Sequence, residues 1–173
     1  NFFALAIKND EKNIAAMNNL ANSYKNLFDY TEAEKIYKKI LNIDHNYVHA
    51  LNNYANLKIE INDHKEAIPL LEKAILISNQ RNIKAIDIRL TLASVYQSIN
   101  NLEKTREILD EIFSIKPKWF KAHKLLSEIT KYSYDDSKSL SHIEEMKKIL
   151  LDKEIKNDDK VILSFALGKS LED

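Results

Sequence analysis

Two consecutive stretches of the sequence decide the fold: IAAMNNLANSYKNLFDYTEAEKIYKKILNIDHN, residues 14–46, and VHALNNYANLKIEINDHKEAIPLLEKAILISNQ, residues 48–80. Written one above the other, they match at an offset of 34 residues in both their large apolar and their small positions. Self-similarity at such a period is typical of structural units that stack in a row. The matching pairs are Leu20 with Tyr54, Ala21 with Ala55, and Ala33 with Ala67.

The small residues predict how one such unit folds. Two antiparallel helices approach closely only where both present small side chains, so we expect Ala21 to face Ala33 across a helix pair. Further units begin at Ile86 and Phe120, and in the fourth unit the segment YSYDDSKS lengthens the turn between the helices. The residues that fit the pattern are Leu92, Ala93, Tyr96, Leu109 and Pro117 in the third unit, and Leu126 and Ser127 in the fourth.

The composition favours helices and excludes several classes of protein. One glycine and two prolines among 173 residues leave little material for hairpin turns or a glycine-rich phosphate loop. The 26 basic and 26 acidic residues balance, which argues against a nucleic-acid partner. With no cysteine there is no disulfide or thiol nucleophile. The sequence shows neither a signal peptide nor an apolar run of about 20 residues, so we expect no membrane contact and a cytoplasmic location.

The unit length and the pattern of small and large residues resemble the tetratricopeptide repeat, a helix–turn–helix unit. The resemblance implies an all-α fold, an α-solenoid of antiparallel helix pairs wound into a right-handed superhelix. Residues 1–173 would then form a single repeat domain that begins and ends within a repeat. Its predicted parts are the second helix of a truncated repeat (1–13), a repeat (14–47), a repeat with a four-residue insertion (48–85), a repeat (86–119), a divergent repeat (120–157) and the first helix of a truncated repeat (158–173).

The histidines give no catalytic or metal-binding pattern. His45 and His49 are four residues apart, but His45 falls in a turn, so the two do not share one helix as a zinc-binding pair would. His64, His123 and His142 are scattered singly, and we interpret them as surface or groove residues. No spacing supports a Ser–His–Asp arrangement. We therefore expect no catalytic residue, metal or cofactor in this chain, which by itself is not an enzyme.

The repeat resemblance places the first helix of each pair along a concave groove, where we expect a partner to bind. Asn19 and Asn22 recur as Asn53 and Asn56 one repeat later. An asparagine amide carries a donor and an acceptor, so a ladder of amides can hold an extended peptide backbone without reading its side chains. The candidate binding residues are Asn18, Asn19, Asn22, Lys25, His49, Asn52, Asn53, Asn56, Thr91 and Ser94.

Two interpretations of these asparagines stay open. In the first, the ladder is functional and looks like the one in the repeat domain of O-linked N-acetylglucosamine transferases, where it holds protein substrates. In the second, an asparagine-rich chain simply scatters asparagine over solvated helix faces. The expected partner is a protein or an extended peptide, and self-association through the ends of the solenoid is a further expectation.

The C-terminal segment HIEEMKKILLDKEIKNDDKVILSFALGKSLED, residues 142–173, resembles the last part of the repeat region of bacterial tetratricopeptide-repeat sulfotransferases. The FALGK motif, residues 165–169, carries this resemblance. It implies a non-catalytic region that binds substrates or partners, followed in the whole protein by a domain using 3′-phosphoadenylyl sulfate. The alternatives are a free-standing adaptor and the repeat arm of an O-linked glycosyltransferase.

The one glycine lies inside the last predicted helix. When Val161 is taken as the first position of a fifth unit, Gly168 falls in the small-residue place where a second helix would press closely. We therefore expect an exposed apolar strip on this last helix.

Overall fold

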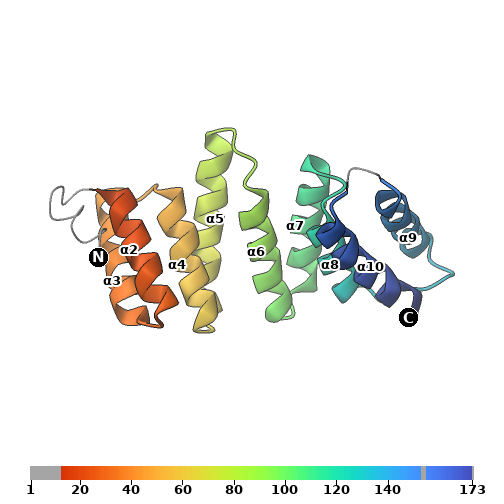
Figure 1. The fold of residues 1–173 in the computed structure, drawn as a ribbon, viewed down its shortest axis with the longest axis horizontal. Helices are drawn as coiled ribbons and strands as arrows, with labels where there is room; N and C mark the ends of the chain where they lie inside the picture. The colour runs from red at the N-terminus through yellow and green to blue at the C-terminus, as the bar shows by residue number, and fades with distance from the viewer. Residues whose placement is uncertain (1–12, 153–154, 173) are drawn as a thin grey trace. The chain divides into compact units, whose positions relative to one another are not determined.

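The computed structural model describes residues 13–152 and 155–172, and all regular structure within these ranges is α-helical (Figure 1). The predicted fold class is therefore confirmed. The helix expected within residues 1–13 lies outside the described residues, apart from Asn13. No helix in the described ranges combines the length and apolar character needed to cross a membrane. The helices are α2 (Ile14–Asn26), α3 (Tyr30–Ile43), α4 (Val48–Glu60), α5 (His64–Gln80), α6 (Ile86–Ser98), α7 (Leu102–Ile115), α8 (Phe120–Ile129), α9 (Ser137–Leu150) and α10 (Asn157–Glu172).

Short polar side chains fix where the second helix of each pair begins. The carboxylates of Asp29 and Asp63 accept backbone hydrogen bonds at the start of α3 and α5, and the amide oxygen of Asn101 does the same for α7. Such a cap satisfies a backbone donor that the helix itself leaves free, and each contributes about 1 kcal/mol. Since the three caps recur at equivalent places, they mark the repeat as clearly as its apolar residues do.

The helix bounds show where the extra residues of the second repeat lie. Helix α5 has 17 residues, whereas α3 has 14. The insertion therefore lengthens the second helix of that repeat by most of a turn, before the turn that leads to α6. In the fourth repeat α8 has only 10 residues, so the longer link before α9 replaces the last turn of the first helix.

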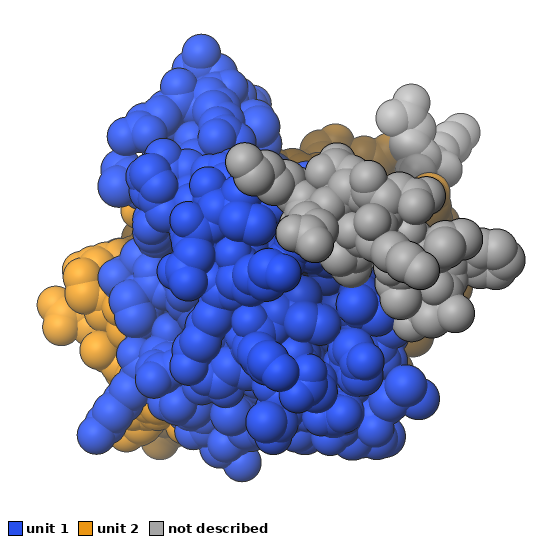
Figure 2. Space-filling model, turned by 90° about the vertical axis from the view of Figure 1, so that its left-hand side faces the viewer, with its two compact units in different colours: residues 1–88 blue, residues 89–173 orange. Residues whose placement is uncertain are grey.

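The chain forms two compact units, residues 1–88 and 89–173, which Figure 2 colours blue and orange. Within the first unit, α2, α3 and α4 enclose one apolar cluster that contains Ala21, Ala33, Tyr37 and Ile40. The two alanines are 0% exposed, as expected for the close approach of α2 and α3. The equivalent alanines of the second pair, Ala55 and Ala67, are also fully buried.

The second unit has polar small residues at the equivalent positions, and they are buried as well. Thr105 of α7, which replaces the second small residue of the third repeat, is fully buried, and its hydroxyl lies 3.4 Å from the carbonyl of Ala93 on α6. In the fourth repeat Ser127 of α8 and Ser139 of α9 hold the two small places and are both buried. A small hydroxyl side chain fits these buried positions because its hydroxyl forms a hydrogen bond with a neighbouring group of the same helix or its cap.

Helix α10 carries the expected exposed apolar strip. Its inner face buries Leu163 and Ala166 against Met146 of α9. Its other face exposes Val161 and Phe165, the latter to 74%, together with Gly168 and Leu171. Apolar residues on two faces of one helix are typical of a helix that is covered on both sides.

We expect Gly168→Ala to stabilise the chain by roughly 0.5–1 kcal/mol, because glycine is a poor residue in a helix interior. A Cβ at this position meets no atom within 4 Å, and the glycine does not adopt a positive φ. Urea unfolding of both chains measures the difference. As a matched control, Ser164→Ala changes an exposed residue on the same helix and should raise stability by less, because serine is a better helix former than glycine. A loss of stability on Gly168→Ala would contradict this account.

Candidate functional site: an asparagine face on α2 and α4

Helices α2 and α4 of the first unit carry the asparagines that we expect to bind a partner. We call the set Asn18, Asn19, Asn22, Asn52, Asn53 and Asn56 the asparagine face. Helix α2 contributes the first three and α4 the last three, and the two helices lie side by side because each is the first helix of its repeat. Several of these asparagines form hydrogen bonds within the protein, which the sequence alone did not indicate.

Three of these asparagines are bound to other parts of the first unit. Asn53 Nδ2 donates to Asn18 Oδ1 at 3.1 Å, which joins α4 to α2, and Asn18 is only 7% exposed. Tyr37 of α3 donates its hydroxyl to Asn22 Oδ1 at 2.5 Å, which leaves the Nδ2 hydrogens of Asn22 as its donors to a ligand. The Asn18–Asn53 bond therefore fixes the spacing of the two helices, in addition to any part in binding.

The other three, Asn19, Asn52 and Asn56, make no side-chain hydrogen bond to any residue in the described ranges. Asn19 is exposed, and Asn52 and Asn56 are partly exposed. Each of these amides carries a donor and an acceptor. They are the groups in this set that a ligand can reach without breaking a bond within the protein.

The two remaining candidates of the first unit lie at the ends of α2 and α4. Lys25 near the C-terminus of α2 forms an ion pair with Glu60 at the C-terminus of α4. His49 in the first turn of α4 is exposed, and its ring contacts that of Tyr47 at a centroid distance of 5.5 Å. Neither side chain is bound within the described residues to the asparagines between them.

The last two candidates, Thr91 and Ser94, belong to α6 and to the second unit. Ser94 is exposed and donates its hydroxyl to the carbonyl of Leu90 at 3.0 Å, which is a local helix contact. Thr91 is partly exposed. The geometry described for the asparagine face concerns the first unit alone.

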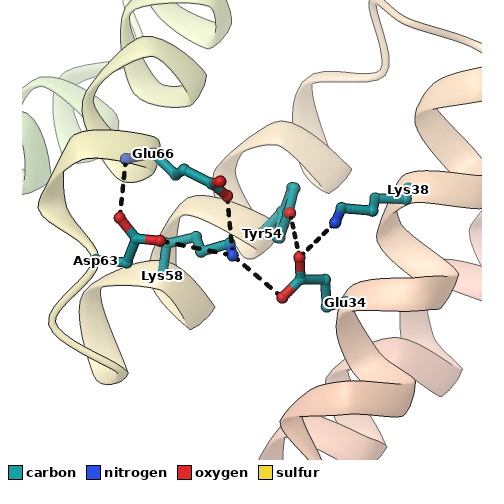
Figure 3. A network of polar contacts seen from close by, with 6 residues as sticks. All are labelled: Glu34, Lys38, Tyr54, Lys58, Asp63 and Glu66. Carbon is teal, nitrogen blue, oxygen red and sulfur yellow. Dashed lines mark hydrogen bonds and ion pairs between the residues drawn. The ribbon is translucent and has the colours of Figure 1, made fainter.

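A second polar cluster in the first unit was not predicted. Lys58 of α4 is only 5% exposed, and its Nζ lies 3.1 Å from Glu34 Oε2 of α3 and 2.9 Å from Glu66 Oε2 of α5 (Figure 3). Asp63, the cap of α5, approaches the same ammonium to 3.8 Å. Tyr54 donates its hydroxyl to Glu34 Oε1 at 2.9 Å. One buried cation thus ties three consecutive helices together.

The ionisation of this cluster follows from its contacts. Burial raises the pKa of Glu34, but hydrogen bonds from Lys38, Tyr54 and Lys58 outweigh it and lower the pKa to about 2. Burial by itself lowers the pKa of Lys58, and the hydrogen bonds to Glu66 and Glu34 reverse this and raise it. Both groups are therefore charged at neutral pH. The sequence contained one indication of this cluster. Lys58 occupies the repeat position that is Tyr24 in the first repeat and Tyr96 in the third.

The interpretation of His123 and His142 as single surface or groove residues was wrong. His123 is fully buried, and its Nδ1 lies 3.0 Å from Nε2 of His142 on the next helix. The sequence separates them by 19 residues, so no local spacing reveals the pair. Only the tertiary structure brings the two rings together, because they lie on different helices.

Comparisons with known proteins agree with the repeat pattern. Two family profiles described as tetratricopeptide repeat match residues 13–80 and residues 58–129. Together they cover residues 13–129, which is more than half of the chain. The chain belongs to the tetratricopeptide-repeat family. A comparison with curated protein sequences gave no significant match.

Solved structures show the same fold at low sequence identity. The structure titled "YrrB: a TPR protein with an unusual peptide-binding site" has a TM-score of 0.68 and 16% identity, covering 99% of this chain and 88% of that chain. MamA gives 0.65 and 18%, covering 98% and 83%. The repeats of a putative kinesin light chain from Podosopora anserina give 0.69 and 14%, covering 93% and 86%.

Proposed function

We propose that this tetratricopeptide-repeat chain is a scaffold that binds an extended peptide on the asparagine face. The observation that carries the proposal is the set of three amides without a partner in the described residues, Asn19, Asn52 and Asn56, on two helices of adjacent repeats. They lie beside the Asn18–Asn53 bond, which holds α2 and α4 at a fixed spacing. Preorganised donors and acceptors lower the entropy lost on binding.

The chemistry of the face favours a peptide backbone as the ligand. A backbone repeats one donor and one acceptor per residue, and each amide side chain offers the complementary pair. A hydrogen bond of this kind nets roughly 0.5–1.5 kcal/mol, so a few of them give weak binding that tolerates many sequences. Such binding suits a scaffold that gains specificity from contacts elsewhere on its partner.

Two kinds of protein are candidates for the one in which this scaffold works. Residues 142–173 resemble the repeat region of sulfotransferases, which would make the chain the partner-binding part of an enzyme using 3′-phosphoadenylyl sulfate. This segment lies outside both matched family segments, so that proposal rests on the sequence resemblance alone. A free-standing adaptor fits the same observations equally well. Both candidates use the asparagine face in the same way.

We expect Asn19→Ala combined with Asn56→Ala to weaken peptide binding about 5- to 150-fold, because two hydrogen bonds are lost. An array of short synthetic peptides first selects a binding peptide, and isothermal titration calorimetry then measures its affinity for both chains. Neither residue bonds to another described side chain and alanine is the better helix former, so the variant should need at least as much urea to unfold as the original chain.

The matched control is Asn42→Ala, which removes an exposed asparagine from α3, outside the asparagine face. The peptide should bind this variant with unchanged affinity. Equal affinities for all three chains would show that the asparagines on α2 and α4 are a result of composition alone.

A further inference from the structure

The lengthened turn of the fourth repeat has a structural role in the second unit. The link between α8 and α9 spans residues 130–136 and contains Tyr132, which is only 4% exposed. Tyr132 Oη lies 2.6 Å from Nδ1 of His142 on α9. His142 in turn contacts His123 of α8 through its Nε2, and His123 Nε2 lies 2.8 Å from the carbonyl oxygen of Pro117. The Tyr132 hydroxyl, the two imidazoles and the Pro117 carbonyl thus form one chain of hydrogen bonds, which we call the relay.

The order of donors in this chain is fixed by its two ends. The carbonyl of Pro117 only accepts, so His123 donates from Nε2 and, when neutral, presents a bare Nδ1. His142 must then donate from its own Nε2, which leaves its Nδ1 to accept from the Tyr132 hydroxyl. Every polar atom in the relay is satisfied when both imidazoles are neutral, and both are then Nε2–H tautomers.

An added proton disturbs the relay at either of the two Nδ1 atoms that can bind it. On Nδ1 of His123 it opposes the Nε2 hydrogen of His142, so that bond is lost. On Nδ1 of His142 it requires the buried Tyr132 hydroxyl to turn and accept, so the hydroxyl hydrogen loses this acceptor. The two rings also stack with centroids 5.2 Å apart, so two imidazolium charges would repel.

The repeat register shows that histidine is not needed for packing here. His123 holds the place of Met17 and Leu51, and His142 holds the place of Ile36 and Leu70. The first two repeats fill these places with apolar side chains that are buried or partly buried. The fourth repeat therefore has titratable groups where the fold itself requires only apolar volume.

Few charges act on the pair from the packed elements. From α9, the carboxylate of Glu145 favours the charged form of His123. From α7, the ring of Phe113 lies 4.7 Å from that of His123 and is uncharged. From α10, Lys169 is held by the carbonyls of Ser127 and Glu128. Burial outweighs Glu145 and lowers the pKa of His123, and burial together with His123 lowers the pKa of His142 to about 4.

We infer that the relay of His123, His142 and Tyr132 is an acid-sensitive lock on the fourth helix pair. The lock joins α8, the link and α9 while both imidazoles are neutral, and it releases them when an imidazole is protonated. Because the folded chain disfavours the charged form of His142, the unfolded segment binds more protons below pH 6.5. The contribution of the lock is therefore complete above pH 6.5 and declines as the pH falls toward 4.

Hydrogen exchange of the whole chain tests the release. Between pH 7 and pH 5, the protection factors of α9 amides should fall about twentyfold through His142 alone, since its pKa is about 4 when locked and 6.5 when released. Amides of α3 should keep their protection, because Glu34 titrates only below this range. Equal losses in α3 and α9, or none in α9, would overturn the inference.

The matched variant combines His123→Leu with His142→Ile, which places in the fourth repeat the residue types of Leu51 and Ile36. Its α9 amides should keep the same protection at pH 7 and pH 5. The same twentyfold fall in this variant would show that other groups control the acid response.

Nuclear magnetic resonance of the imidazole nitrogens tests the lock without relying on the folding of that variant. Both rings should be Nε2–H tautomers at pH 7, and a hydrogen on Nδ1 of His123 would overturn the relay. In Tyr132→Phe, Nδ1 of His142 loses its donor and is free to take a proton, so His142 should titrate at a higher pH than in the original chain. An unchanged titration would show that the hydroxyl has no part in the lock.

Discussion

Replacing Lys58 with methionine is expected to lower the free energy of unfolding by about 3 kcal/mol, which urea denaturation at pH 7 would measure. The change keeps the apolar length of the side chain but leaves the carboxylates of Glu34 and Glu66 without their shared cation. Removing one partner of a buried ion pair is far more harmful than removing both, because the remaining charge stays desolvated. The expected loss is at the low end of the usual range, since Glu66 is 57% exposed and regains water.

The matched control is Lys38→Met, which removes an exposed cation from the same Glu34 carboxylate. This ion pair lies within one helix and at the surface, so we expect a loss below about 0.5 kcal/mol. Equal losses for the two variants would show that the burial of Lys58 has no energetic consequence.

The pH dependence of the cluster separates it from the histidine lock. The pKa of Glu34 is about 2 in the folded chain and 4.5 ordinarily, so its stabilising effect is complete above pH 4.5 and is lost as the pH falls toward 2. The lock weakens between pH 6.5 and 4, in the other unit. Acid should therefore destabilise α9 before α3.

Tyr37→Ala is expected to lower the free energy of unfolding by about 3–5 kcal/mol, the usual cost of truncating a buried aromatic residue. Tyr37 is fully buried between α2, α3 and α4, and its ring stacks on that of Tyr54 at a centroid distance of 5.8 Å. Its loss leaves a cavity and removes the hydroxyl that holds Asn22. Denaturation by urea measures the difference.

Tyr37→Phe is the control because it keeps the ring and removes only the hydroxyl. The loss should be about 1 kcal/mol, the usual net value of one hydrogen bond. Peptide affinity adds a second measurement, since Asn22 Oδ1 becomes free to accept from a ligand. A Tyr37→Ala loss no larger than that of Tyr37→Phe would mean that the ring contributes little to the core.

Much of the fold was predictable because repetition constrains it. The recurrence of Ala21 and Ala33 as Ala55 and Ala67 indicated helix pairs in close contact, and all four residues are fully buried. The sequence also showed that the segment YSYDDSKS departs from the repeat pattern, but it did not show how this segment would fold. A longer turn predicts only a longer link, whereas the contact of Tyr132 with His142 depends on how that link folds back onto α9.

The polar residues in core places were the least predictable part. Lys58, Arg89 and His123 each occupy a place that other repeats fill with apolar or aromatic residues. Arg89 is 5% exposed and pairs with Glu111 of α7 at 3.1 Å, so it too is buried with a partner. The sequence marks such residues as exceptions to the pattern, but it does not name their partners.

The sequence by itself determined the repeat length, the helix pairs, the close contacts at small residues and the family, because a period of 34 residues places every side chain relative to its own unit. Only the tertiary structure decided which asparagines are bound within the first unit and which carboxylates Lys58 holds. It also decided that two histidines on different helices are hydrogen-bonded to each other. The Asn18–Asn53, Glu34–Lys58 and His123–His142 contacts join residues that are 19 to 35 positions apart, and they depend on interhelical distances of a few ångströms. A periodic pattern gives the face of a helix on which a residue lies, but a hydrogen bond also requires the height and rotamer of the residue opposite.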